Sequence, residues 1–452
     1  MAALARARFA DAFGEALGDG GVVAAGRVAV VGAGLAGLSA ALDLVDAGFD
    51  VELFERSRLL GGRATSFVVD GIEVDNGQHV FLGCCVELIH FVERVGMAGC
   101  LHLQDRFEAL VLTRDGVGSR LRAAGLPPPW HLLASFMGYR HISWPSKVRI
   151  ARALARAGEA ARTGGSFAQW LARCGQTEDA LRGFWRPFFV PALNAPLEEV
   201  SAADAAFVLS TAFLGDADSA RFGYTTIPLA RVAAAAAARL GAVHLATPVI
   251  GLDVARDRSR ALGLVLGSGA TQPFDALILA VAPPHLARLA GEPERLGLPA
   301  LDGFVAHAIV DVHLWHDRGR LGFDFAALLD SPVQWIFEKA SGYLCCSLSA
   351  AERHINAPTN AIVDECWHEA RAAIGTLAGA QLERSAVTRN PEATYTASAH
   401  QQRPGPATAL SNVAIAGSWT ATGWPDTMES AVRSGRGAAR HVVEALRGMC
   451  VA

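Results

Sequence analysis

The sequence contains very little lysine and has no excess of positive charge. Lys147 and Lys339 are its two lysines, so arginine supplies nearly all of the 40 basic side chains, against 44 acidic ones. The formal net charge of −4 gives no overall attraction to a polyanion. We therefore expect no nucleic-acid partner.

Cysteine occurs without the spacing that metal sites or redox pairs require. None of the eight cysteines belongs to a C-x-x-C motif, and Cys84–Cys85 and Cys345–Cys346 are adjacent pairs, which are poorly suited to internal bridging. This pattern predicts buried free thiols in a reducing compartment and no metal site. We expect a cytoplasmic protein.

Long uninterrupted hydrophobic runs are also missing, although hydrophobic residues make up 51% of the chain. No stretch of about 18 apolar residues is free of charge, so we expect no membrane-spanning helix. Asp11, Glu15 and Asp19 interrupt the first 26 residues, which we interpret as a disordered or loosely docked extension rather than a secretory signal. The 452 residues are enough for two or three domains.

The most informative motif that is present follows an apolar strand. Residues 28–37 read VAVVGAGLAG. Gly32 permits a tight turn, Gly34 lets the backbone approach a pyrophosphate, and Gly37 lets the next helix pack closely on the strand. The N-terminus of that helix offers free N–H groups and the positive end of its dipole to phosphates. A second strand leads to Glu55, 18 positions after Gly37, which is the place for a carboxylate that binds an adenosine ribose. The motif predicts a dinucleotide site.

The rest of the chain alternates between strand-rich and helix-rich segments. Apolar runs and alternation predict strands at 66–69, 72–74, 243–246, 249–254, 262–266, 276–281, 305–315, 333–337, 343–348 and 413–416. Helical patterns predict helices at 229–240, 359–374 and 427–446. Residues 126–240 are mainly helical by the same criteria, with Ser146 and Ser166 as expected N-caps.

This order of elements predicts an α/β fold in which a Rossmann-type nucleotide-binding domain is interleaved with a mixed sheet-plus-helix substrate domain. We expect the nucleotide-binding domain to consist of residues 27–100, 241–285 and 406–452. The substrate domain then consists of residues 101–240, which carry the helical subdomain, and residues 286–405.

A second informative region lies near the C-terminus. The strand at 413–416 ends at Gly417, and a loop containing Trp419 and Trp424 leads to a helix that begins near Thr427. The N-terminus of such a helix stabilises negative charge on the pyrimidine ring of a reduced flavin. Taken alone, the same residues also fit a capped C-terminal helix that packs on the first domain.

These motifs together resemble the FAD-dependent amine oxidase and phytoene desaturase superfamily, because GAGLAG, Glu55, the loop Gly61-Gly62-Arg63 and the C-terminal loop and helix all match. Three further segments resemble its squalene-associated branch, the hydroxysqualene dehydroxylases of bacterial hopanoid biosynthesis: DNGQHVFLGCC at 75–85, FFVPALN at 188–194 and GWPDTMESA at 423–431. The resemblance covers residues 27–445 and implies an amine oxidase-like fold with a tightly held FAD.

The resemblance also implies cofactor contacts: Gly32, Gly34 and Gly37 at the pyrophosphate, Glu55 at the adenosine ribose, Gly62 and Arg63 at the pyrophosphate and ribityl chain, Val249 at adenine, and Gly417 and Met428 at the pyrophosphate and flavin ends. We further expect cofactor contacts from Arg56, Gly77 and Gln78. Many members of the superfamily carry an acid where this chain has Ser418, so Asp426 is the alternative contact to the ribityl chain.

The branch implies a reaction in which reduced FAD donates a hydride to hydroxysqualene, water leaves and squalene forms. Hydroxide is a poor leaving group, so an acid must protonate it. An apolar pocket raises a carboxyl pKa or lowers a histidine pKa, which suits either group to that task. His79 and Asp75 are the first candidates for the acid and Asp426 is the next. A core histidine, a turn-bracing aspartate and a helix cap are the alternative interpretations.

Other functions stay open at this point. A carotenoid-type desaturase or isomerase would move a hydride from polyene to flavin, and a prenyl-lipid escort protein would keep the fold without redox chemistry. Trp185, Phe188, Phe189 and Trp335 are candidates for lining a polyene pocket, where aromatic faces also stabilise a cation, or are plain core. The sequence identifies neither the electron donor for FAD nor the oligomeric state.

Residues 126–162 form a candidate contact with a membrane surface. An apolar and aromatic stretch that ends near Trp144 is followed by Lys147, Arg149, Arg152, Arg156 and Arg162, and three of these arginines share one helical face. Such a unit can lie in a bilayer interface. A triterpene substrate dissolved in lipid would favour peripheral docking on the inner face of the cytoplasmic membrane. The alternative is a buried helical subdomain with a solvated basic face.

Overall fold

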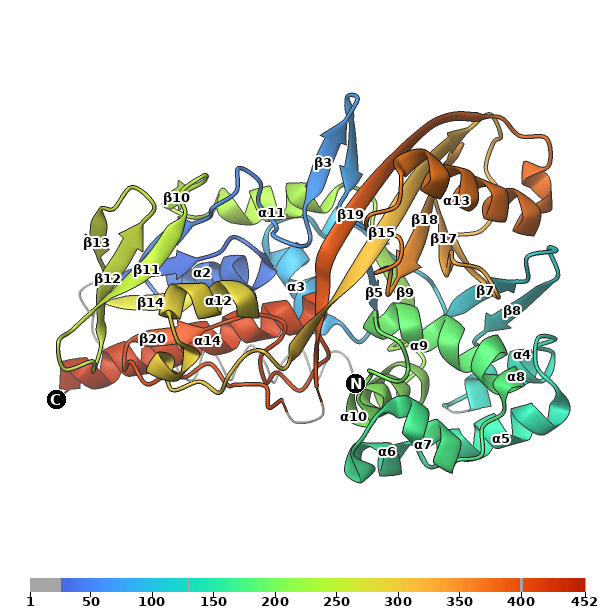
Figure 1. Ribbon diagram of the computed structural model, residues 1–452, viewed down its shortest axis with the longest axis horizontal. Helices are drawn as coiled ribbons and strands as arrows, with labels where there is room; N and C mark the ends of the chain where they lie inside the picture. The colour runs from blue at the N-terminus through green and yellow to red at the C-terminus, as the bar shows by residue number, and fades with distance from the viewer. Residues whose placement is uncertain (1–25, 129, 399–400, 452) are drawn as a thin grey trace.

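The computed structural model describes residues 26–451 with gaps at 129 and 399–400 (Figure 1). The expected N-terminal extension therefore lies outside the described residues, apart from Gly26. No helix of the described part is long and apolar enough to cross a membrane. Seven cysteines within it are free thiols, as expected, and five of them are buried: Cys85, Cys100, Cys345, Cys346 and Cys366. Cys84 and Cys174 are partly buried.

A five-stranded parallel sheet carries the glycine-rich motif. Its strands are ordered β10 (Ala242–His244), β2 (Asp50–Phe54), β1 (Arg27–Val31), β14 (Ala276–Leu279) and β20 (Val413–Ile415). Three distant parts of the sequence thus pair side by side, with β1 in the centre. The carboxyl ends of parallel strands meet at one edge, which is where ligands bind in open α/β sheets.

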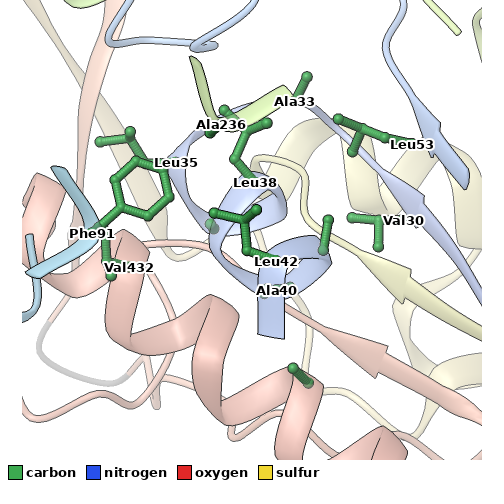
Figure 2. Close-up of a cluster of buried hydrophobic side chains, with 14 of the residues drawn as sticks. Val30, Ala33, Leu35, Leu38, Ala40, Leu42, Leu53, Phe91, Ala236 and Val432 are labelled. Carbon is green, nitrogen blue, oxygen red and sulfur yellow. The ribbon is translucent and has the colours of Figure 1, made fainter. Parts of the chain in front are cut away.

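Helices cover one face of this sheet, and a small sheet covers the other. Val28 and Val30 pack with α2 (Leu35–Asp46) and with α3 (Val86–Arg94), α11 (Leu229–Ala237) and α14 (Met428–Val451). Figure 2 shows Leu38 and Leu42 of α2 at the centre of this cluster. Ala29 and Val31 pack with β11 (Val249–Val254), β12 (Ala261–Leu266) and α12 (Pro283–Ala290), and β13 (Thr271–Pro273) pairs with β12. Burial on both faces explains why β1 is apolar throughout rather than alternating.

A seven-stranded mixed sheet forms the second half of the molecule. Its order is β19 (Leu382–Ala397), β15 (Phe304–His316), β18 (Tyr343–Ser349), β17 (Trp335–Ala340), β16 (Phe325–Leu328), β7 (Glu108–Leu112) and β8 (Gly118–Arg122). Helix α13 (Thr359–Ala373) packs on one face through Ile362, Cys366 and Ala370, at the upper right of Figure 1.

The opposite face of this sheet packs on a helical subdomain, at the lower right of Figure 1. Its helices are α4 (Leu133–Met137), α5 (Trp144–Ala155), α6 (Ala157–Thr163), α7 (Phe167–Arg173), α8 (Glu178–Ala180), α9 (Arg186–Leu193) and α10 (Ala202–Val208). Two π-helical turns, Leu181–Trp185 and Leu209–Phe213, precede α9 and follow α10. Such turns are frequent at functional sites.

Two small sheets connect the halves. The hairpin of β3 (Ser66–Val69) and β4 (Ile72–Asp75) turns at Asp70-Gly71, and the second small sheet consists of β5 (Val80–Leu82), β9 (Phe222–Thr225) and β6 (Leu101–Leu103). The segment 76–79 between β4 and β5 is thereby held between the two halves.

Candidate active site

A cavity of about 1140 Å³ lies between the two halves of the molecule. It is lined by residues that follow β1 and β2, by residues of β15, β17 and β18, and by α9 and the start of α14. A cavity of this size exceeds the usual range of about 300–1,000 Å³ for one small ligand. It therefore has room for a large cofactor together with part of a substrate.

The glycine-rich turn at Gly32 and Gly34 lines one end of this cavity, which we call its first end. Gly32 and Gly37 are required by the protein's own packing, because a Cβ at Gly32 would lie 2.4 Å from the Ala280 carbonyl oxygen and one at Gly37 would lie 1.9 Å from that of Gly32. A Cβ at Gly34 would meet nothing closer than 4.0 Å. Gly34 faces the cavity, so its lack of a side chain leaves room for a ligand rather than for protein atoms.

Helix α2 begins at this turn, and no side chain of the part of the chain that the structure describes caps its N-terminus. Gly34 is its N-cap, no side chain caps it, and its first turn contains no acidic residue. Unsatisfied N–H groups and a positive dipole end that face a cavity form a site for an anion such as a phosphate. This arrangement fits the pyrophosphate of a dinucleotide.

Glu55 lies beside the turn and is held in place by the backbone. Its two carboxylate oxygens accept hydrogen bonds from the N–H groups of Ala33 and Ser57, both at 2.8 Å. Arg56 and Val249 line the cavity next to it, and Val249 is the first residue of β11. A fixed carboxylate at this position suits the hydroxyl groups of a ribose.

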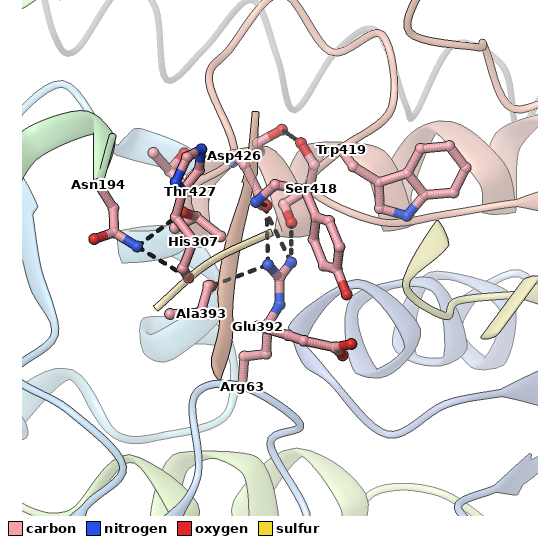
Figure 3. Close-up of polar contacts among 12 residues, drawn as sticks. Arg63, Asn194, His307, Glu392, Ala393, Ser418, Trp419, Asp426 and Thr427 are labelled. Carbon is pink, nitrogen blue, oxygen red and sulfur yellow. Dashed lines mark hydrogen bonds and ion pairs between the residues drawn. The ribbon is translucent and has the colours of Figure 1, made fainter. Parts of the chain in front are cut away.

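Arg63 connects the first end of the cavity to the C-terminal loop (Figure 3). Its guanidinium donates to both carboxylate oxygens of Asp426 at 2.9 and 3.1 Å and to the Ser418 hydroxyl at 2.5 Å. Burial alone would lower the pKa of Arg63, but the ion pair with Asp426 outweighs it and raises that pKa. The Asp426 carboxylate also accepts the N–H of Tyr395 at 2.5 Å. Asp426 is thus engaged in an ion pair with Arg63. This favours a role in holding Arg63 in place over a role as the acid.

The start of α14 faces the cavity beside this ion pair. Met428 lines the cavity, and the Thr427 hydroxyl caps the helix by accepting the N–H of Ser430 at 3.2 Å. Gly417, at the end of β20, also lines it. The positive dipole end of this helix therefore faces the cavity.

The far end of the cavity is apolar and aromatic. It is lined by side chains from the helical subdomain and the seven-stranded sheet, among them Phe107, Phe188, Phe207, Phe222, Phe325, Trp335 and Phe337. Phe222, Phe325 and Trp335 pack edge to face or tilted, with ring centroids 4.7–5.8 Å apart. Of the expected pocket aromatics, Trp185 and Phe189 instead lie in the helical core beside Phe167, because their side of the helix faces away from the cavity.

His79 lines the cavity, and Asp75 does not. The Nε2 atom of His79 is buried and has no hydrogen-bond partner among the described residues. Burial lowers the pKa of His79, against an opposing effect of Asp75 and with a further lowering by Lys339. Asp75 accepts from the Leu229 N–H at 2.9 Å and the Ser66 hydroxyl at 2.8 Å, so it caps α11. Its second oxygen lies 3.7 Å from Lys339 Nζ.

Asp311 is a buried polar residue of the same region that sequence reasoning missed. It is 1% exposed, and its Oδ1 accepts the N–H of Gln78 at 3.3 Å. Burial raises the pKa of Asp311 to about 6. The alternation of the strand expected at 305–315 does not reveal that Asp311 is buried, because the residues around it, Gln78 and Cys345, come from distant segments.

The structure brings the sequence-predicted site residues together around one cavity. Those that line it are Gly32, Gly34, Glu55, Arg56, Gly62, Arg63, Gly77, Gln78, His79, Val249, Gly417, Asp426 and Met428. Gly37 lies behind the turn, and Asp75 lies behind segment 76–79. Across residues 26–451, gaps excepted, no group of His, Cys, Asp and Glu is arranged to hold a metal ion.

Comparison with known proteins identifies the class of protein that this fold and site define. Residues 35–443 match the family model of the flavin-containing amine oxidoreductases, and the chain belongs to that family. It is a flavin-dependent oxidoreductase.

The chain is similar to individual hydroxysqualene dehydroxylases and carotene desaturases over most of its length. A hydroxysqualene dehydroxylase from Rhodopseudomonas palustris is 28% identical, with 93% of this chain and 99% of the relative covered. One from Sinorhizobium fredii is also 28% identical, over 91% of this chain and 97% of the relative. A zeta-carotene desaturase from Capsicum annuum is 24% identical, over 93% of this chain and 81% of the relative.

Solved structures share the fold. A putrescine oxidase superposes with a TM-score of 0.71 at 18% identity and covers 93% of this chain and 99% of its own. The cyclohexylamine oxidase of Brevibacterium oxydans gives 0.70 at 18% identity, with 94% and 100% covered. The amine oxidase-like fold expected from the sequence is therefore confirmed.

Proposed function

We propose that the chain binds FAD and, with FAD reduced, removes the hydroxyl group of hydroxysqualene to give squalene. The single observation that carries this proposal is the joined cavity, in which an aromatic, apolar end continues from a dinucleotide-binding turn. Similarity to hydroxysqualene dehydroxylases along nearly the whole chain supports it.

The residues at the turn suit FAD rather than a shorter flavin. The α2 N-terminus and Gly34 would hold the pyrophosphate, and Glu55 would bind the adenosine ribose. Arg63 and Asp426 would fix the ribityl chain, and the α14 N-terminus would stabilise charge on the flavin ring. When bound and reduced, FAD supplies a hydride.

The apolar end of the cavity would hold the triterpene chain and exclude water. Loss of an allylic hydroxyl leaves a delocalised positive charge, which the faces of Phe222 and Trp335 stabilise. The hydroxyl group must gain a proton before it leaves. His79 is our choice for the acid, because Asp75 and Asp426 are already engaged by α11 and Arg63.

An anaerobic single-turnover experiment tests the function. We would reduce the bound flavin, add hydroxysqualene in detergent, and follow the visible flavin band and the extracted lipid. We expect flavin reoxidation with an equal amount of squalene, and a rate about 100-fold lower or more in His79→Gln with flavin content unchanged. Squalene itself is the control substrate and should leave the flavin reduced.

A carotenoid-type desaturase is the second candidate, since a zeta-carotene desaturase is similar over most of both chains. A reduced flavin that stays reduced, with hydroxysqualene untouched, would contradict the first proposal. Flavin reduction on mixing oxidised enzyme with zeta-carotene would then support the second.

We also propose that the helical subdomain rests on a membrane surface. Its exposed large apolar side chains gather between β8 and the middle of α5: Leu126, Trp130, Leu133, Met137, Trp144 and Val148. Arg149, Arg152 and Arg156 are exposed beside them. Tyr139 and Lys147 are buried, and Lys147 donates to the Met137 carbonyl at 2.6 Å, so neither belongs to this surface. A lipid-soluble substrate would reach the enzyme there.

A further inference from the structure

The cavity-facing side of β15 carries two buried polar side chains, Asp311 and His313. Ala308, Val310, Val312 and Leu314 belong to the cluster under α13. Alternation along the strand therefore turns Ile309, Asp311 and His313 to the other side, and Ile309 lines the cavity. Asp311 is the acidic member of this side.

One oxygen of Asp311 is satisfied and the other is not. Oδ1 accepts the Gln78 N–H at 3.3 Å, and the Cys345 thiol lies 3.7 Å away. Oδ2 is buried and makes no hydrogen bond of ordinary geometry among the described residues, while the Ser347 side chain also lies beside this carboxyl group and lowers its pKa. A buried polar atom without a partner requires an explanation, such as a catalytic part or a bound water.

The unpartnered oxygen shares its surroundings with the unpartnered nitrogen of His79. A Cβ on Gly77 would lie 3.1 Å from Asp311 Oδ2 and 4.0 Å from His79 Nε2. Both atoms thus border the same small space beside Gly77, which glycine leaves open. A carboxyl group and an imidazole that face one space are suited to share a proton, directly or through one water.

We propose that Asp311 is a positioning residue that holds, beside Gly77, the proton that His79 passes to the leaving hydroxyl group of the substrate. This inference rests on the proposed dehydroxylation. The hydroxyl oxygen takes a proton from the His79 imidazolium, the C–O bond breaks and water leaves. The carbon takes a hydride that bound, reduced FAD would supply, which leaves the flavin oxidised by two electrons. The pair is then a neutral His79 and an Asp311 carboxylate, and it takes up one proton from solvent before the next turnover.

Burial supports this assignment by bringing the two proton affinities together. It raises the pKa of Asp311 to about 6 and lowers the pKa of His79, so burial disfavours the charged form of each group. The other titratable or charged groups around the pair are Asp75, Lys339, His313, Tyr343, Cys345 and Arg63.

The test compares pH profiles of the single-turnover reoxidation rate in the flavin-loaded enzyme. In the wild type the rate should fall as pH rises, because the acid loses its proton. In Asp311→Asn the carboxylate no longer stabilises the imidazolium, so this fall should move at least about one pH unit lower. The variant should then be about tenfold slower at pH 8 and close to wild type at pH 5. Thr388→Val is the matched control, since Thr388 pairs with Asp311 in β19, is buried and lies outside the cavity lining.

A parallel loss of rate at every pH would assign Asp311 to structure alone and overturn the proposal, as would an unchanged profile. A second readout needs no substrate. The His79 imidazole signal, identified by its absence in His79→Gln, should titrate about one pH unit lower in Asp311→Asn than in the wild type. An equal titration midpoint contradicts the pair. If the wild type forms no squalene, the proposed function fails while this titration still decides whether the two groups share a proton.

Discussion

At the residue scale, two glycines of one turn differ in what surrounds them. Gly37 touches protein, because a Cβ there would overlap the Gly32 carbonyl oxygen at 1.9 Å. A Cβ at Gly34 would meet protein atoms no closer than 4.0 Å, and the φ of Gly34, −74°, is accessible to any residue. Gly37 is therefore needed for the fold, whereas the lack of a side chain at Gly34 is explained by a ligand.

This difference predicts opposite outcomes for two alanine substitutions. Gly37→Ala should destabilise the apoprotein by about 3 kcal/mol, as overpacking does. Gly34→Ala should cost about 1 kcal/mol of stability but weaken flavin binding tenfold or more, which is about 1.4 kcal/mol. Chemical unfolding of the apoprotein and the ratio of flavin to protein absorbance after gel filtration measure the two effects.

Gly437→Ala is the control, because Gly437 lies in α14 with nothing within 4 Å of an added Cβ. It should leave flavin content unchanged and raise stability by about 1 kcal/mol. Wild-type flavin retention in Gly34→Ala would mean that the cofactor does not approach this turn.

At the scale of elements, local patterns predicted most boundaries. The helix expected at 359–374 is Thr359–Ala373, and the strand expected at 305–315 is Phe304–His316. Ser166 is an N-cap within a capping box, as predicted. The N-cap expected at Ser146 was wrong, since α5 begins one turn earlier with Ser143 as its cap and Pro145 in its first turn. Pro145 signals a nearby helix start, but it lies in the first turn of α5 and not ahead of the helix.

The parts that could not be predicted depend on contacts between distant segments. Strand β19 has a polar, proline-containing sequence and is extended because it pairs along β15. Asp311 and the space beside Gly77 arise where segment 76–79 docks on β15, more than 230 positions away. Tertiary pairing of this kind overrides local propensity. The glycine-rich turn and His79 do line the cavity, as expected. The turn follows from a short-range pattern, whereas His79 was expected there from the resemblance of segment 75–85.

Helix α5 carries a prediction about membrane contact. Its Ile150 and Ala153 face the helical core, whereas Trp144, Arg149 and Arg152 are exposed. The double variant Arg149→Glu and Arg152→Glu should bind anionic phosphatidylglycerol vesicles about tenfold more weakly or worse, because each cation near such a surface contributes about 1 kcal/mol. Cosedimentation with the vesicles measures this.

Arg256→Glu is the matched control, since Arg256 is exposed in the turn between β11 and β12, outside the helical subdomain. It should sediment like the wild type. Equal sedimentation of the double variant would place the membrane contact elsewhere or remove it.

At the scale of the whole molecule, the cavity lies between two separately packed halves. The parallel sheet has its own cores on both faces, and so does the seven-stranded sheet. The cavity takes lining residues from both halves, including Gly34, Glu55, Trp335 and Met428. A cofactor that fills the cavity would contact both halves and so stabilise the way they pack together.

FAD should therefore raise the stability of the whole chain, and the two halves should unfold together in one transition when FAD is bound. At free FAD about 1,000 times its Kd, the expected stabilisation is about 4 kcal/mol, seen in calorimetry as a Tm increase of several degrees over the apoprotein. FMN lacks the adenylate half that the α2 N-terminus and Glu55 would hold, so it should give a much smaller increase. Equal effects of FAD and FMN would mean that the glycine-rich turn does not bind the cofactor. No effect of either would remove the cavity as the flavin site.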